Sequence, residues 1–120
     1  MSQIKILAVE DDPIYAESLE LIIKELGYEL VGIVDNALAA LQLVDETLPD
    51  LILMDIEIND SVSGIELAAR INSSRKIPII FVTAFRDKET FQQAKLTLPR
   101  AYIIKPYDPS SLQSAIELAI

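Results

Sequence analysis

The chain of 120 residues contains no cysteine and no histidine. Without cysteine it can form no disulfide and can use no thiol nucleophile, which agrees with a cytosolic setting. Without histidine, a metal ion must be held by oxygen ligands, and oxygen ligands favour Mg²⁺ and related hard cations over zinc. The two absences therefore direct the search for a site to the acidic residues.

Long apolar runs and clusters of basic residues are also missing. No apolar stretch approaches the length of a membrane-spanning helix, and the N-terminal apolar residues reach Glu10 too soon for a secretory signal peptide. Ten Lys and Arg residues are scattered among 19 Asp and Glu residues, which gives a formal net charge of −9. We therefore expect no nucleic-acid binding by this chain. Most of the negative charge is explained by solubility.

Five short apolar runs recur along the chain, and stretches with helical periodicity separate them. The runs cover residues 4–9, 30–34, 51–54, 79–82 and 101–104. Such alternation is typical of βα units around a parallel sheet. The hydrophobic content of 51% suits a sheet that is covered on both faces. At this length the pattern predicts one α/β domain over residues 1–120.

The stretches between the runs predict five helices. The first begins after Asp12 and stops at Gly27, the second covers about residues 36–46, and the third begins near Gly64. The fourth covers about residues 87–96, and the fifth begins at Asp108-Pro109. The apolar positions expected to face the sheet are Leu19, Ile22, Ile23, Leu26, Ala37, Leu41, Val44, Ile65, Leu67, Ala68, Ile71, Phe91, Ala94, Leu98, Leu112, Ala115, Ile116 and Ala119.

Polar side chains follow four of the five predicted strands. Because the carboxyl ends of parallel strands meet at one edge of a sheet, and ligands of α/β domains bind there, we expect these side chains to form one site. They are Glu10, Asp11, Asp12, Asp55, Thr83 and Lys105.

Each of these residues also has an ordinary structural explanation. Asp12 is best explained as a helix cap, and Asp55 could simply begin a loop. Neighbouring carboxylates such as Glu10 and Asp11, however, repel each other unless a cation or base lies between them. Asp11 and Asp55 could share one Mg²⁺, which would position a phosphoryl group and neutralise its charge. Aspartate is also an accepted nucleophile for phosphoryl groups.

The residues near the last strands are less informative one by one. Lys105 could be a surface lysine, but its place between an apolar run and Pro106 favours an inward point charge for phosphate. A cis bond before Pro106 would aim that lysine, although a small minority of such bonds are cis. Thr83 suits a strand by itself, and Tyr102 by itself is more often a packing residue.

Taken in order, Glu10-Asp11, Asp55, Thr83-Ala84, Tyr102 and Lys105-Pro106 resemble the receiver domains of two-component response regulators, over essentially the whole chain. The resemblance implies a flavodoxin-like sheet of five parallel strands in the order 2-1-3-4-5. It also implies that Asp55 takes a phosphoryl group from a histidine kinase or a phosphotransfer protein, in a reaction that needs Mg²⁺ or Mn²⁺.

The resemblance also implies a role for each matching position. Asp11 and Asp55 would bind the metal, with Glu10 assisting through water and the backbone carbonyl of Glu57 completing the protein ligands. The Glu57 carboxylate would lie at the rim of the site, either solvated or turned inward. Thr83 would move to the phosphoryl oxygen, Lys105 would pair with the acceptor and its phosphate, and Tyr102 would swing between exposed and buried rotamers; Ala84 and Pro106 complete the match.

The implied output surface consists of the fourth helix, the fifth strand and the fifth helix. A downstream effector or a C-terminal output domain would read this surface, and a homodimer could form through it. Two loops depart from the family pattern: residues 56–63 are about one residue longer than usual and lack a common proline, and Leu98-Pro99 replaces the usual Gly-Ala before the fifth strand.

Three other classes are alternatives. A docking module that works without phosphorylation usually lacks the acceptor or the lysine, and both are present here. A Mg²⁺-dependent phosphohydrolase with an Asp nucleophile would carry its Asp-x-Asp motif on the first strand. A flavodoxin-like electron carrier would have a Ser/Thr/Gly-rich phosphate loop where this chain has acids. We therefore expect a cytoplasmic signalling domain whose only chemistry is self-phosphorylation and autodephosphorylation.

Overall fold

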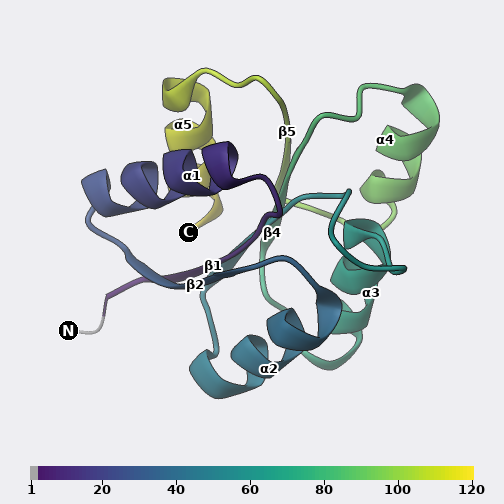
Figure 1. The fold of residues 1–120 in the computed structure, drawn as a ribbon, viewed down its shortest axis with the longest axis horizontal. Coiled ribbons are helices and arrows are strands. Elements are labelled where there is room, and N and C mark those ends of the chain that lie inside the picture. Colours follow the sequence, from purple (N-terminus) through teal and green to yellow (C-terminus); the bar gives the residue numbers. More distant parts are fainter. Residues whose placement is uncertain (1–2) are drawn as a thin grey trace.

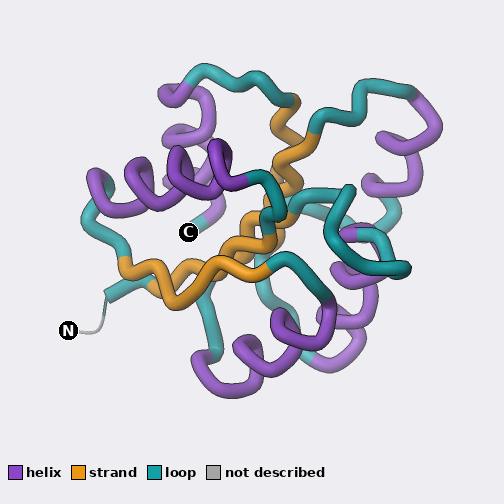
Figure 2. Tube along the Cα trace, viewed as in Figure 1, coloured by secondary structure: helices purple, strands orange, loops and turns teal. Residues whose placement is uncertain are grey.

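Residues 3–120, which the computed structural model describes, form a parallel sheet of five strands with helices on both faces (Figures 1 and 2). The strand order is β2-β1-β3-β4-β5. This result confirms the flavodoxin-like α/β fold and the strand order expected from the sequence. The strands are β1 (Lys5–Val9), β2 (Glu29–Val34), β3 (Leu51–Met54), β4 (Ile79–Thr83) and β5 (Ala101–Ile104).

The two faces of the sheet are covered by different helices, and Figure 1 shows both layers. Alternate strand residues such as Ile6 and Leu53 pack with α1 (Pro13–Glu25) and α5 (Pro109–Ala119). Their neighbours, such as Leu7 and Met54, pack with the helices of the other face. Those helices are α2 (Ala37–Thr47), α3 (Gly64–Ser74) and α4 (Lys88–Lys95). All residues of β3 and β4 are buried, which explains why these strands read as continuous apolar runs.

A side-chain oxygen caps the first turn of every helix among the described residues. In each case the side chain before the helix accepts a hydrogen bond from a backbone N–H of the first turn, which would otherwise lack a partner. The caps are Asp12, Asn36, Ser63, Asp87 and Asp108. Asp12 therefore has the ordinary role that the sequence indicated.

Most of the positions expected to face the sheet are buried or pack against the core, but Leu98 is an exception. Leu98 is 84% exposed and has a φ of 56°, beyond the end of α4 at Lys95. The prediction was wrong because the helical periodicity stops where the chain turns toward β5. Phe91 is 42% exposed, and Ala94 is the buried residue of α4. Over residues 3–120, no helix has the length and apolar content that crossing a membrane requires.

Candidate functional site

Most of the predicted site residues meet at the carboxyl-terminal edge of the sheet, around a cavity of about 730 Å³; Tyr102 does not line it. The cavity is lined by Asp11 from the end of β1, Asp55 and Glu57 from the end of β3, Thr83 from β4 and Lys105 from the end of β5. Ala84 and Pro106 line it as well. Three of the polar groups are almost inaccessible to water, because Asp55 is 5% exposed, Thr83 is 0% exposed and Lys105 is 8% exposed.

Lys105 joins two carboxylates at the centre of the site. Its Nζ donates a hydrogen bond to Oδ2 of Asp55 at 2.8 Å and another to Oε2 of Glu10 at 3.0 Å, and it lies 2.8 Å from Oε1 of Glu10. Burial by itself would lower the pKa of Lys105, but the hydrogen bonds to Asp55 and Glu10 outweigh it and raise the pKa above its usual value. The Lys105 side chain thus lies inside the site, 8% exposed, and its peptide bond to Pro106 is cis.

The negative charge of the site exceeds what one lysine can balance. Burial, together with the nearby Asp55, raises the pKa of Glu10 from 4.5 to about 7, although the hydrogen bond from Lys105 opposes this shift. Glu10 also accepts a hydrogen bond from the backbone N–H of Asp12 at 3.2 Å. Near neutral pH the site therefore favours either a proton on Glu10 or an additional cation.

Carboxylate oxygens of Glu10, Asp11 and Asp55 lie within 4.8 Å of one another, which is a suitable arrangement for one metal ion. Oε1 of Glu10 is buried and accepts no hydrogen bond among the described residues, but it lies 2.8 Å from the Lys105 ammonium, so it already has one cation beside it. The donors are all oxygens, as Mg²⁺ and Mn²⁺ prefer. Glu57 is exposed at the rim of the cavity, and its backbone N–H donates to Oδ1 of Asp55 at 3.2 Å. These residues fit a divalent cation.

Tyr102 does not line the cavity, but it contacts the loop that follows Thr83. Its hydroxyl donates to the backbone carbonyl of Phe85 at 3.0 Å, and its ring packs edge-on against Phe91 with 5.1 Å between centroids. Thr83 contacts the same loop, because its Oγ1 accepts a hydrogen bond from the N–H of Phe85 at 3.2 Å. Phe85 thus connects Thr83 and Tyr102. Burial raises the pKa of the Tyr102 hydroxyl.

Two further residues contact Lys105, and the sequence analysis did not identify either. The ring of Tyr15 lies under the ammonium of Lys105, 4.4 Å from it, and Arg86 donates a hydrogen bond to the backbone carbonyl of Lys105 at 3.2 Å. Tyr15 is placed four residues after Asp11 on α1, and this spacing is the one sequence signal that could have suggested it. Nothing in the sequence around Arg86 indicates its contact.

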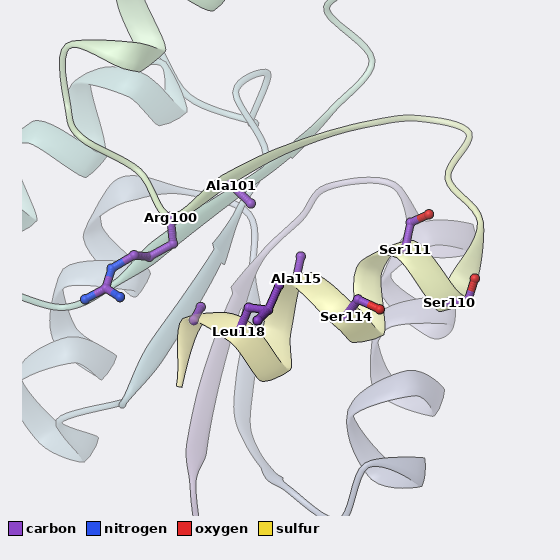
Figure 3. A pocket seen from close by; sticks show the side chains of 8 residues that line it. Arg100, Ala101, Ser110, Ser111, Ser114, Ala115 and Leu118 are labelled. Carbon is purple, nitrogen blue, oxygen red and sulfur yellow. The ribbon is translucent and has the colours of Figure 1, made fainter.

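A second groove, of about 490 Å³, lies between the start of β5 and α5 (Figure 3). Ser111, Ser114 and Leu118 line it from α5, and Arg100 lines it from the other side. In Figure 3 the Arg100 side chain extends away from the serine hydroxyls. The residues that line this groove include no carboxylate and none of the predicted site residues.

The sequence matches the family described as "Response regulator receiver domain" over residues 6–117. Among curated proteins, it is 34% identical over 116 residues to the transcriptional regulatory protein PdtaR of Mycobacterium tuberculosis, covering 97% of this chain and 56% of that protein. It is 31% identical over 117 residues to the phyllosphere-induced regulator PhyR of Methylorubrum extorquens, covering 97% of this chain and 43% of PhyR. The chain thus spans about half the length of these relatives.

A solved structure shows the same fold. The signal receiver domain of a modulated diguanylate cyclase from Desulfovibrio desulfuricans superposes with a TM-score of 0.90 and is 37% identical, covering 99% of this chain and 94% of the other.

Proposed function

Because the chain belongs to the receiver domains of response regulators, a signalling family of two-component systems, we propose that Asp55 is its phosphoacceptor. One observation carries this proposal: the Asp55 carboxylate is buried in the site and lies 2.8 Å from the Lys105 ammonium, beside two further carboxylates. We further propose that residues 1–120 act as one receiver domain. A docking module that works without phosphorylation is not favoured, since acceptor and lysine are in contact.

The reaction is the transfer of one phosphoryl group to Asp55. A carboxylate oxygen of Asp55 attacks phosphorus, the bond between phosphorus and the donor breaks, and the donor leaves with the electron pair of that bond. With a histidine kinase or phosphotransfer protein the leaving group is an imidazole, and with a small donor such as acetyl phosphate it is acetate. Hydrolysis of the resulting acyl phosphate returns the free carboxylate.

The side chains of this chain would share the charge of that reaction. Asp11 and Asp55 would hold Mg²⁺ or Mn²⁺ directly, Glu10 through water, and Glu57 through its backbone carbonyl. The bound cation would neutralise phosphoryl charge. Lys105 would then transfer its hydrogen bond from the carboxylate to a phosphoryl oxygen.

The signal would pass through Thr83 and Tyr102. Thr83 would turn its hydroxyl to a phosphoryl oxygen and release the N–H of Phe85, and Tyr102, bonded to the carbonyl of Phe85, would follow. This change would alter the surface of α4, β5 and α5, which is where we place a downstream effector, a C-terminal output domain or a second copy of the chain.

Receiver domains of this family work with histidine kinases and with output domains. The two curated relatives above are named as regulators, and both are longer than this chain. We expect this chain to act in the cytoplasm, as response regulators generally do, and any nucleic-acid binding to belong to another part of such a protein. The net charge of −9 supports that division.

Incubation with acetyl phosphate, followed by mass spectrometry of the intact chain, tests the acceptor. The chain should gain one phosphoryl group only when Mg²⁺ or Mn²⁺ is present, and Asp55→Asn should abolish the gain. Asp12→Asn is the matched control, because asparagine also caps α1 and the acceptor stays intact. Labelling that survives Asp55→Asn, or that needs no metal, would reject the assignment.

A further inference from the structure

The loop that follows Asp55 is fastened to the N-terminus of α2. Oδ2 of Asp60 accepts a hydrogen bond from the backbone N–H of Ala37, the first residue of α2, at 2.9 Å. The N–H of Asn59 donates to the backbone carbonyl of Asp35 at 2.9 Å, and the Asn59 side-chain amide reaches the Asp35 carboxylate at 3.4 Å. These contacts join two loops that are 23 and 24 positions apart in the sequence.

Asp60 is not needed to start α2, because Asn36 already caps that helix by accepting from the N–H of Ala39 at 2.9 Å. Asp60 supplies a second oxygen, carried by a different loop. The hydrogen bond from Ala37 is the main cause that lowers the pKa of Asp60, so the group stays a carboxylate at the positive end of α2. Its other oxygen accepts from the N–H of Val62 at 3.3 Å and shapes the loop itself.

Glu57 lies between two sets of anchors on this loop. Its neighbours Ile56 and Ile58 are buried, at 4% and 7% exposure, and the N–H of Gly64 donates to the carbonyl of Ile56 at 2.7 Å. On the other side of Glu57, the contacts of Asn59 and Asp60 tie the loop to α2. The main chain of Glu57 therefore has little freedom as long as both sets of anchors hold.

We propose that Asp60 is a positioning residue of the metal site, because by fastening the loop to α2 it holds the backbone carbonyl of Glu57 where a divalent cation can use it. The proposal rests on the metal site of the proposed function and adds a connection from that site to α2. Since such coupling is reciprocal, a bound cation must in turn strengthen the contact between Asp60 and Ala37.

Calorimetric titration of the intact chain and three variants with Mg²⁺ tests whether Asp60 positions the Glu57 carbonyl. It distinguishes that role from two simpler effects of Asp60, its negative charge and its contribution to the stability of α2. Asp60→Ala removes both the charge and the hydrogen-bond acceptor. Asp60→Asn removes the charge but keeps an acceptor oxygen for Ala37. Asn36→Ala removes the other cap of α2 and leaves Asp60 in place. Circular dichroism of each variant verifies that it is folded.

Asp60→Ala should raise the Kd for Mg²⁺ about tenfold. Loss of a group that orients a metal ligand without binding the metal itself typically weakens metal affinity by about 10-fold to 100-fold, and we expect the lower end of that range. Asp60→Asn should stay within about twofold of the parent chain, and so should Asn36→Ala. Equal weakening in Asp60→Asn and Asp60→Ala would mean that charge alone acts, and equal weakening in Asn36→Ala would mean that the stability of α2 alone acts. Either outcome, or an unchanged Kd in Asp60→Ala, overturns the proposal.

Hydrogen exchange of the parent chain gives a second readout that needs no variant. Saturating Mg²⁺ should slow the exchange of the Ala37 amide by about tenfold, matching the effect of Asp60 on affinity, while the Ser110 amide at the start of α5 stays unchanged. An Ala37 amide that is indifferent to Mg²⁺ would overturn the coupling. If the parent chain binds no Mg²⁺ at all, the proposed metal site fails together with this inference. Binding that does not depend on Asp60 overturns the inference alone.

Discussion

Two loops leave the site from neighbouring strands, and they are anchored very differently. The metal-side loop (residues 56–63) follows β3 and leads to α3, and the switch-side loop (residues 84–87) follows β4 and leads to α4. The metal-side loop has two buried isoleucines and is tied to α2 through Asp60. Two side-chain hydrogen bonds join the switch-side loop to β5 and to the residue that follows it. The Tyr102 hydroxyl donates to the backbone carbonyl of Phe85, and the Arg86 side chain donates to the backbone carbonyl of Lys105.

The helices that follow the two loops continue this contrast. α3 buries Gly64, Leu67, Ala68 and Ile71, whereas Ala94 is the one buried residue among the eight of α4. A segment with few buried apolar contacts opens at low free-energy cost. If the proposed function is right, the acceptor Asp55 and the metal-side loop belong to the better anchored side of the site, and the segment that responds to phosphorylation belongs to the less anchored side.

Breaking the rigid side at Gly64 should have the largest effect. A Cβ at this position would lie 1.9 Å from the backbone carbonyl oxygen of Asp55, so Gly64→Ala forces the main chain of the acceptor to move. We expect a loss of about 4 kcal/mol in the free energy of unfolding, measured by urea titration.

Gly27→Ala is the matched control for this substitution. Gly27 has a φ of 81°, but a Cβ there would meet nothing within 4 Å, so the loss should be about 1 kcal/mol from backbone strain alone. Equal losses in the two variants would show that Gly64 is not pressed against the acceptor and would weaken the case for a rigid metal side.

Truncating one apolar residue on each side measures the contrast between α3 and α4 directly. Leu67 is 0% exposed, so Leu67→Ala should cost about 3 kcal/mol. Phe91 is 42% exposed, so Phe91→Ala should cost about 1 kcal/mol although it removes a larger side chain. Urea titrations of both variants compare the two sides, and a cost for Phe91→Ala that matches Leu67→Ala would abolish the distinction.

The charge of the rigid side should appear as a pH dependence. The pKa of the Glu10 carboxyl is 4.5 in the unfolded chain and about 7 in the folded state. Between pH 4.5 and 7 the folded chain therefore holds a proton on Glu10 that the unfolded chain has lost. Between these values the folded state binds more protons, so the contribution of Glu10 to stability falls as pH rises. In the absence of divalent cations, Glu10→Gln should therefore gain about 3 kcal/mol relative to the parent chain between pH 4.5 and 7.5.

Urea titrations at several pH values measure this difference between the two chains. The comparison cancels the contributions of the other acids, which both chains share. A constant difference across the pH range would mean that folding does not raise the pKa of Glu10. Addition of Mg²⁺ should flatten the curve of the parent chain, because a cation near Glu10 favours its charged form.

The fold and the central residues of the site were predictable because both follow from local patterns. Apolar runs of strand length separated by helical periodicity determined the sheet, and the shared edge of parallel strands brought Asp55 and Lys105 together. Leu98 was predicted wrongly, because a left-handed residue after α4 ends the periodicity on which the prediction relied.

The contacts that anchor the two loops could not be predicted in the same way. Asp60 looks like an ordinary loop acid, and its partner Ala37 is 23 positions away. The ring of Tyr15 on α1 lies under the Lys105 ammonium, and Arg86 donates to the carbonyl of Lys105, although these residues are far apart in the sequence. Such pairs depend on the packing of distant elements, and apart from the spacing of Tyr15 from Asp11 a single sequence carries no signal for them.

The smallest expected effect comes from loosening the switch side at Arg86. This exposed arginine donates one hydrogen bond to the backbone carbonyl of Lys105, so Arg86→Ala should cost about 0.5 kcal/mol. Its effect should instead be local: hydrogen exchange of the amides at residues 84–87 should become faster, while the Kd for Mg²⁺ stays the same. Arg75→Ala is the control, because Arg75 pairs with Asp45 on the surface and contacts neither loop. A change in Mg²⁺ affinity in Arg86→Ala as large as that in Asp60→Ala would mean that the two sides of the site are not mechanically separate.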